Sequence, residues 1–148
     1  MSKTHLAIMR SSWGLLPKIV SGEKTIESRW YQNQYQPWKK IDSGDIIYFK
    51  DSGQPVTVKA KAGKILRFDH LTPQKVKEIL LKFGKDDGLD IQQDFNFYYK
   101  KFKNKNYCLL IFLKDVQTIL PFKISKQGFG AMSAWLVVDD INQMKIIK

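Results

Sequence analysis

The sequence contains one cysteine, Cys108, and two histidines, His5 and His70, in 148 residues. A single cysteine excludes a disulfide within the chain and fits a reducing compartment, so we expect a cytoplasmic protein. These three side chains offer no zinc-ligand spacing, and we expect neither a metal nor another cofactor. No apolar run approaches the roughly 18 residues of a membrane span, and the first ten residues lack the long apolar core of a signal peptide. We therefore expect no membrane association.

Acidic residues are also few: 14 Asp and Glu stand against 25 Lys and Arg, which gives a formal net charge of +11. Such a balance favours association with polyanions, most often nucleic acid. The alternative is a lysine-rich surface without a binding role. Charge of this kind sets attraction rather than specificity, so a defined site must come from particular residues.

The length suits one domain, residues 1–148, with a core that needs no covalent staples. We expect strands at 5–10, 24–30, 45–50, 56–68, 107–113, 116–124 and 131–138, and helices at 15–21, 73–83 and 90–103. Ser11 and Ser12 are candidate capping residues, Thr72 is a candidate N-cap, Gly22 a C-cap and Gly63 the site of a bulge. The sum predicts an α+β protein with a small mixed or closed sheet of about six strands, flanked by helices.

The expected second strand lies in SGEKTIESRW, residues 21–30, and is unusually charged for a strand. Alternate side chains share a face, which gives one row of Ile26, Ser28 and Trp30 and another of Thr25, Glu27 and Arg29. Glu27 and Arg29 are about 6.6 Å apart along the strand, so they either pair or converge on one bound group. Lys24 lies at the mouth of this polar row. The alternative is an exposed face with an ion pair worth about 0–1 kcal/mol.

GEKTIESR resembles the G-x-K-T-x-E-x-R signature of the ASCH domain, a branch of the PUA-like superfamily. IDSGDIIYFKD resembles the G-D-x-I-x-F strand of that family, and the resemblance is clearest over residues 5–69. It implies a small PUA-like β-barrel flanked by helices. It also implies a ligand cleft lined by Lys24, Glu27 and Arg29, because related domains bind RNA or modified nucleotides there.

The chemistry of these side chains suits a nucleotide. Arg29 offers a planar fork for phosphate or for the acceptor edge of a base, and Glu27 accepts from an amine or a sugar hydroxyl. Aromatic side chains in loops are candidates for stacking on a base, with ordinary packing as the alternative for each. The candidate binding residues are Trp13, Lys24, Thr25, Glu27, Arg29, Trp38, Lys39, Lys40 and Phe129, and Tyr31 and Tyr35 are further candidates for the aromatic lid. The expected partner is RNA or a nucleotide, while DNA and a protein partner remain open.

Two other functions remain possible from the sequence. Some ASCH proteins are amidohydrolases of acylated cytidine with a K-T-x-T-x-R pattern, and others resemble ribonucleases. Here Glu27 replaces the second threonine, and only Glu78 lies in a plausible region for the downstream glutamate. If the protein is an enzyme, Lys24 and Glu27 are the catalytic candidates, with the pKa of Lys24 lowered by Arg29. ASCH domains also occur in transcription coactivators, which leaves a protein-interaction module of a transcription or translation regulator as a third possibility.

A second basic segment, YYKKFKNK at residues 98–105, interleaves aromatic residues and lysines. Its helical spacing fits an ordinary amphipathic helix with aromatic side chains in the core and lysines in water. The alternative is a phosphate-binding face beside the cleft.

Overall fold

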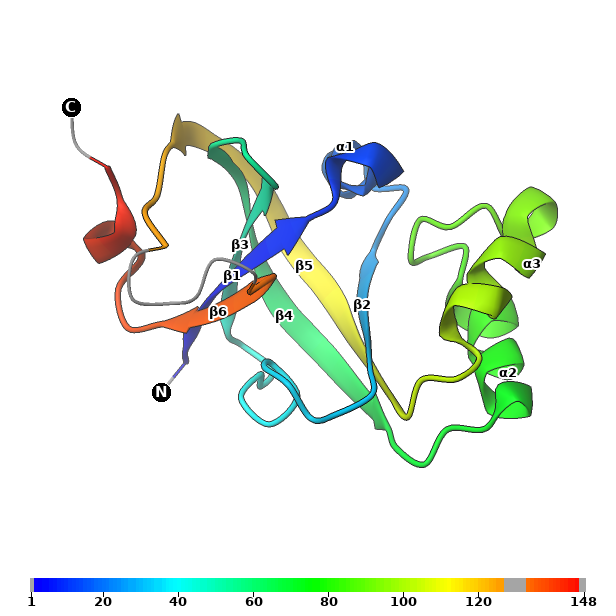
Figure 1. The fold of residues 1–148 in the computed structure, drawn as a ribbon. Helices are drawn as coiled ribbons and strands as arrows, with labels where there is room; N and C mark the ends of the chain where they lie inside the picture. Colours follow the sequence, from blue (N-terminus) through cyan, green and yellow to red (C-terminus); the bar gives the residue numbers. More distant parts are fainter. Residues whose placement is uncertain (1, 127–132, 147–148) are drawn as a thin grey trace.

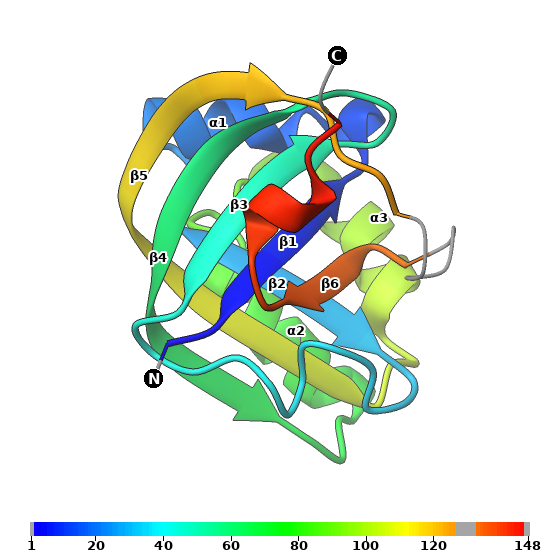
Figure 2. The same ribbon diagram turned by 90° about the vertical axis from the view of Figure 1, so that its left-hand side faces the viewer.

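The structure, a computed structural model, describes residues 2–126 and 133–146 and is built around one six-stranded mixed sheet with the order β2-β5-β4-β3-β1-β6. The strands are β1 (Thr4–Met9), β2 (Ile26–Tyr31), β3 (Ile46–Asp51), β4 (Val56–Phe68), β5 (Tyr107–Phe122) and β6 (Trp135–Val138). β1 and β3 are parallel, and the other neighbours are antiparallel. The sheet curls into a half-barrel whose edges are β2 and β6 (Figures 1 and 2).

The curl comes from irregular pairing between the two longest strands, β4 and β5. Their register shifts at three places, one of them next to Gly63, where the sequence predicted a bulge. A Cβ atom at Gly63 would lie 3.2 Å from the carbonyl oxygen of Phe112, so the close approach favours glycine. The prediction of two strands at 107–113 and 116–124 was wrong, because β5 continues through Asp115, which takes a left-handed φ of 53°.

Within the described residues, three α-helices flank the sheet, as predicted. They are α1 (Leu15–Ser21), α2 (Pro73–Phe83) and α3 (Ile91–Phe102), and two short 3₁₀ helices, η1 (Ser11–Trp13) and η2 (Ile141–Met144), accompany them. Thr72 caps α2 by accepting from the backbone N–H of Lys75 at 3.2 Å, and Gly22 ends α1 with a φ of 86°, both as predicted. Ser11 and Ser12 form η1 and do not cap α1, which Gly14 precedes.

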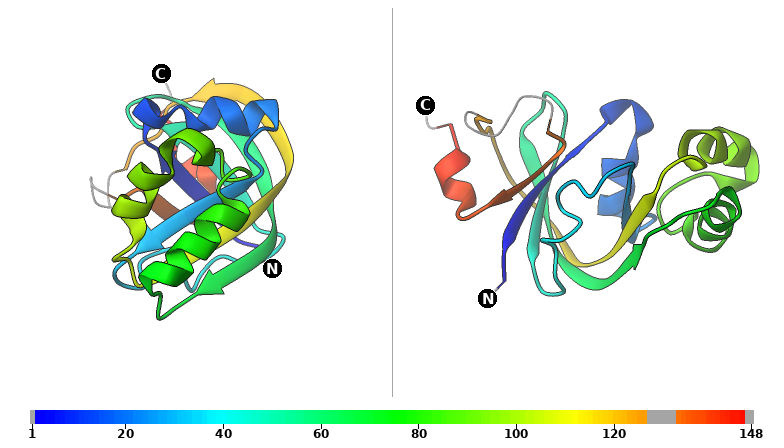
Figure 3. Two further views of the ribbon diagram at one scale, coloured as in Figure 1. Left: turned by 90° about the vertical axis from the view of Figure 1, so that its right-hand side faces the viewer. Right: turned by 60° about the horizontal axis from the view of Figure 1, so that its bottom comes forward.

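The helices divide the core into layers. Figure 3 shows α2 and α3 side by side at one end of the half-barrel, with η2 at the other. The barrel interior packs Phe49, Leu109 and Ile111 against α1, while Ile79 and Leu80 of α2 pack toward the sheet and toward α3. The predicted α+β fold, a mixed sheet of about six strands flanked by helices, is confirmed. Among the described residues, no helix combines the length and the apolar character needed to cross a membrane.

A buried hydrogen-bonded chain joins β1, β6 and the start of β3. The Nε2 atom of His5 lies 2.8 Å from a carboxylate oxygen of Asp45, and the indole N–H of Trp135 donates to Nδ1 of His5 at 2.9 Å. An indole N–H only donates, so Nδ1 of His5 accepts and the imidazole is neutral. Burial lowers the pKa of His5 although the Asp45 carboxylate opposes that shift. The neutral ring therefore fixes Trp135 in place.

These hydrogen bonds of a neutral His5 predict that the stability of the protein falls in mild acid. The folded pKa of His5 lies below its ordinary value of 6.5, so the unfolded state binds a proton that the folded state lacks as the pH falls below that value. The free energy of unfolding should then drop by up to about 1.4 kcal/mol per pH unit. Urea unfolding at pH 7.5 and 5.5 should show this loss in the wild type and in exposed His70→Gln. His5→Gln should not show it. If the free energy of unfolding of His5→Gln fell between pH 7.5 and 5.5 by as much as that of the wild type, His5 would not be the group responsible.

Candidate functional site

Lys24 lies two residues before β2, with its side chain fully buried. Its ammonium group donates to the carbonyl oxygens of Ile26 at 2.6 Å and Asp87 at 2.7 Å, and to the carboxylate of Asp87 at 2.5 Å. A carboxylate oxygen of Glu27 lies 3.2 Å from the same nitrogen. The ammonium group thus ties the start of β2 to the loop between α2 and α3.

Glu27 connects Lys24 to Arg29. Its second carboxylate oxygen accepts from Nη2 of Arg29 at 2.8 Å and from Nε at 3.2 Å. Of the two possibilities that strand alternation left open for Glu27 and Arg29, the structure shows the direct pair. Arg29 then reaches across the opening of the half-barrel, where its guanidinium lies 3.4 Å from the carbonyl oxygens of Ile8 and Ala134 and 5.1 Å from the ring of Trp135.

Opposite charges in this network stabilise one another, although burial and the charge of Glu27 raise the pKa of Asp87. Burial by itself would lower the pKa of Lys24, but the charges of Asp87 and Glu27 outweigh burial and raise it. Burial likewise opposes ionisation of Glu27, yet Lys24 and Arg29 hold the pKa of that carboxyl below its usual value. The prediction that Arg29 lowers the pKa of Lys24 was wrong, because the carboxylates of Asp87 and Glu27 contact Lys24 and raise its pKa.

Asp87 is a residue of the candidate site that the sequence did not indicate. The segment GKDDG indicated only the end of a helix, and nothing in its spacing connects Asp87 to Lys24, which lies 63 residues earlier in the sequence. Ser28 donates its hydroxyl to the other carboxylate oxygen of Asp87 at 2.5 Å. Gly88, at a φ of 84°, permits this approach, since a Cβ there would lie 3.2 Å from carbons of Lys24.

A cavity of about 290 Å³ lies over this network. Its lining comes from β1, η1, α1, β2, the α2–α3 loop, α3 and residue 134: Ile8, Met9, Arg10, Trp13, Leu15, Glu27, Ser28, Arg29, Trp30, Tyr31, Asp87, Leu89, Lys101, Phe102 and Ala134. Trp13 is half-buried, and the exposed cations of Arg10 and Lys101 lie 5.8 and 5.4 Å from the centre of its ring. The cavity thus combines aromatic surface, a guanidinium, two carboxylates and an exposed cationic margin.

Several predicted site residues line this cavity and others do not. Glu27, Arg29 and Trp13 line it, whereas Lys24 is buried outside the lining, where it holds Glu27. Thr25 is exposed outside the cavity and contributes only backbone hydrogen bonds. Glu78 lies elsewhere, on the exposed surface of α2.

The loop at residues 31–43 contributes less than predicted. Trp38 lies in the core against Tyr107, with the ring centres 5.1 Å apart, and it does not line the cavity. Lys39 and Lys40 are exposed beside it, and neither lines the cavity. Tyr31 does line the cavity, whereas Tyr35 is exposed outside it; Phe129 lies outside the described residues.

The basic segment 98–105 is both an amphipathic helix end and part of the site. Phe102 is buried and stacks on Trp30, with ring centres 4.6 Å apart, as the packing interpretation predicted. Lys101 is exposed and lines the cavity, which fits the alternative interpretation. In the ranges 2–126 and 133–146, no three His, Cys, Asp or Glu side chains come together to hold a metal ion.

Solved structures of other proteins share this fold. An ASCH protein from Zymomonas mobilis is 19% identical, with a TM-score of 0.67, over 95% of this chain and 91% of that chain. The N-terminal domain of McrB from Staphylothermus marinus is 13% identical, with a TM-score of 0.60, over 97% of this chain and 92% of that chain. No protein-family model and no curated protein sequence matches the chain. The chain shares the α+β fold of these two proteins, and the fold that the resemblance of its signature implied is confirmed.

The network predicts that Asp87→Asn destabilises the protein strongly. Loss of this carboxylate leaves the buried charges of Lys24 and Arg29 to share Glu27 alone, and breaking a buried pair in this way costs about 3–5 kcal/mol. Asp86→Asn is the matched control because its side chain is exposed, and it should change stability by less than about 0.5 kcal/mol. Urea unfolding followed by circular dichroism measures both. Equal stability of the two variants would show that the Lys24–Asp87 pair does not hold the site.

Proposed function

We propose that this protein binds single-stranded nucleic acid and holds one base in the cavity over β2. The observation that carries the proposal is the combination, in one cavity, of the Arg29–Glu27 pair with the ring of Trp13 and two exposed cations beside it. The volume of about 290 Å³ is near the lower end of ligand pockets, roughly 300–1,000 Å³, and suits a single base rather than a larger cofactor.

The polar groups of the cavity are suited to the edge of a base. Glu27 takes Nε and Nη2 of Arg29, which orients the guanidinium and leaves Nη1 with only a 3.4 Å contact to Ala134. That nitrogen can donate to an acceptor of the base. Asp87 lines the same cavity and accepts from amines, and burial raises the pKa of Tyr31 to about 12, so its phenol stays neutral.

The cationic margin is suited to the sugar-phosphate chain. Arg10 and Lys101 are exposed beside the ring of Trp13, where phosphates of a bound strand can reach them. The net charge of +11 adds long-range attraction for any polyanion. The ASCH fold is consistent with this proposal. RNA and DNA present the same phosphates and base faces, so the experiments below use both.

The proposal is for binding rather than catalysis because of the position of Lys24. A lysine has three N–H donors, and those of Lys24 face Ile26, Asp87 and Glu27 inside the protein. A hydrolase mechanism that uses Lys24 as a base would require it to lose a proton and meet the substrate. Its raised pKa and complete burial oppose both requirements.

Trp13→Leu should weaken binding of a single-stranded oligonucleotide. Stacking of one base on an aromatic ring contributes about 1–3 kcal/mol, so the affinity should fall roughly 5- to 150-fold. Tyr35→Leu is the control, since Tyr35 is 60% exposed and lies outside the cavity. Fluorescence anisotropy with labelled oligo(U) and oligo(dT) measures both variants. Equal affinities for the two variants would remove Trp13 from the site.

Arg10→Gln and Lys101→Gln should reduce the salt dependence of binding. Each lost phosphate contact should make the slope of log K against log salt shallower by about 0.7. The double variant Lys77→Gln/Lys85→Gln removes two exposed charges outside the cavity and should leave the slope unchanged. An oligonucleotide affinity of the wild type that does not vary with salt would contradict phosphate contacts by Arg10 and Lys101.

A further inference from the structure

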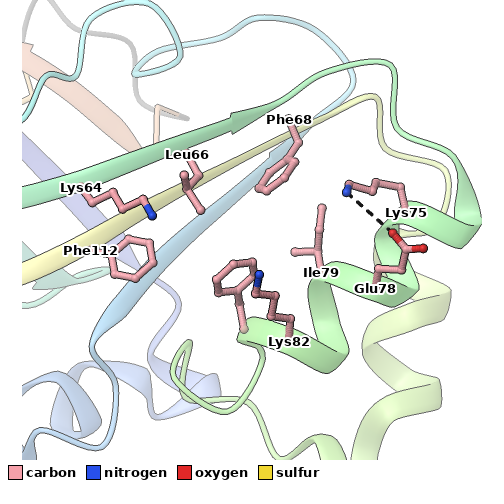
Figure 4. Close-up of a pocket in the computed structure, with 9 residues that line it drawn as sticks. Lys64, Leu66, Phe68, Lys75, Glu78, Ile79, Lys82 and Phe112 are labelled. Atoms are coloured by element: carbon pink, nitrogen blue, oxygen red, sulfur yellow. Dashed lines mark ion pairs between the residues drawn. The ribbon is translucent and has the colours of Figure 1, made fainter.

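A second concave surface lies between the sheet and α2 (Figure 4). This groove has a volume of about 660 Å³ and is lined by Lys64, Leu66, Phe68, Lys75, Glu78, Ile79, Lys82, Phe83 and Phe112. It shares no lining residue with the cavity over β2, so any role it has is separate from the proposed nucleotide site.

The floor of the groove is apolar and only half-covered by the protein. Phe68 and Leu66 come from the end of β4 and Phe112 from β5. Phe83 comes from α2, and its ring centre lies 6.3 Å from that of Phe112. These four side chains are half-buried, whereas Ile79 beneath them is 3% exposed. A contiguous apolar surface of this kind, bordered by charged side chains, is typical of a binding site.

The border of the groove is positively charged. Lys64 lies 5.8 Å from the ring centre of Phe112, Lys75 lies 5.4 Å from that of Phe68, and Lys82 lies 5.3 Å from that of Phe83. Lys75 also pairs with Glu78 at 3.7 Å. Neither Lys64 nor Lys82 forms an ion pair with an acidic residue in the described ranges, so two ammonium groups are available to an anionic partner.

We propose that this groove binds a short amphipathic acidic segment of a protein partner. Apolar side chains of the segment would pack on the phenylalanine floor, and its carboxylates would pair with Lys64 and Lys82. Nucleic acid fits the groove less well, because the apolar floor lacks hydrogen-bonding side chains that could read the edge of a base.

A selection with random 12-residue peptides tests this proposal on the whole protein. Enriched peptides should combine Asp or Glu with Leu, Ile or Phe, and their affinities are then measured by fluorescence anisotropy with labelled synthetic copies. The double variant Lys64→Glu/Lys82→Glu should lose at least tenfold in affinity. Lys77→Glu/Lys85→Glu changes the net charge equally outside the groove and should retain wild-type affinity; thermal unfolding confirms that both variants are folded.

Three results would overturn the proposal. They are a selection that enriches no peptide, one that enriches peptides without acidic residues, and equal peptide affinity for the two double variants.

Binding of oligo(U), oligo(dT) and vesicles containing anionic lipid is measured with the same proteins. If one of these ligands depends on Lys64 and Lys82 while no peptide does, the groove belongs to that ligand. Loss of oligonucleotide binding in Trp13→Leu with unchanged peptide binding separates the two sites.

Discussion

The buried ion pair between Lys24 and Asp87 is the interaction on which the site depends. It joins Lys24, two residues before β2, to the loop between α2 and α3, alongside backbone hydrogen bonds from Thr25 and Ile26 to the carbonyl oxygen of Asp86. The same ammonium group holds Glu27, and Glu27 in turn orients Arg29. Burial of so many charges is tolerable only because each has an opposite charge and hydrogen-bond partners, so the removal of one member affects all the others.

This network explains why a strand so rich in charge lies at the edge of the sheet. β2 and β6 are the two edges of the half-barrel, and the opening between them is bridged by the guanidinium of Arg29, which reaches Ile8 and Ala134. Trp135, fixed by His5, packs under that guanidinium. Closure by side chains leaves room for a cavity, which continuous backbone pairing of the edges would fill. The charged strand therefore builds a hollow and does not simply present a solvated face.

Local patterns in the sequence predicted those parts of the structure that depend on local geometry. The period of two along β2 predicted that Glu27 and Arg29 share a face, and the Thr72 cap and helical spacing predicted α2. Lys24 was misplaced at the mouth of the site because it precedes the strand, where alternation no longer applies. The pairing of Asp87 with Lys24 and the burial of Trp38 depend on contacts between distant segments, which a single sequence does not reveal. The break that the sequence indicated between two strands near residue 115 is a bulge within β5. The polar pair Lys114 and Asp115 resembles a turn in sequence, although the strand continues through it.

The central claim is that nucleic acid binds in the cavity over β2. Photo-cross-linking of a single-stranded oligonucleotide that carries a photoreactive base, followed by peptide mass spectrometry, tests it most directly. The account predicts cross-links at aromatic residues of the lining, Trp13 or Tyr31, from RNA, DNA or both. Cross-links confined to the groove between the sheet and α2, or no more cross-linking than the denatured protein gives, would contradict it.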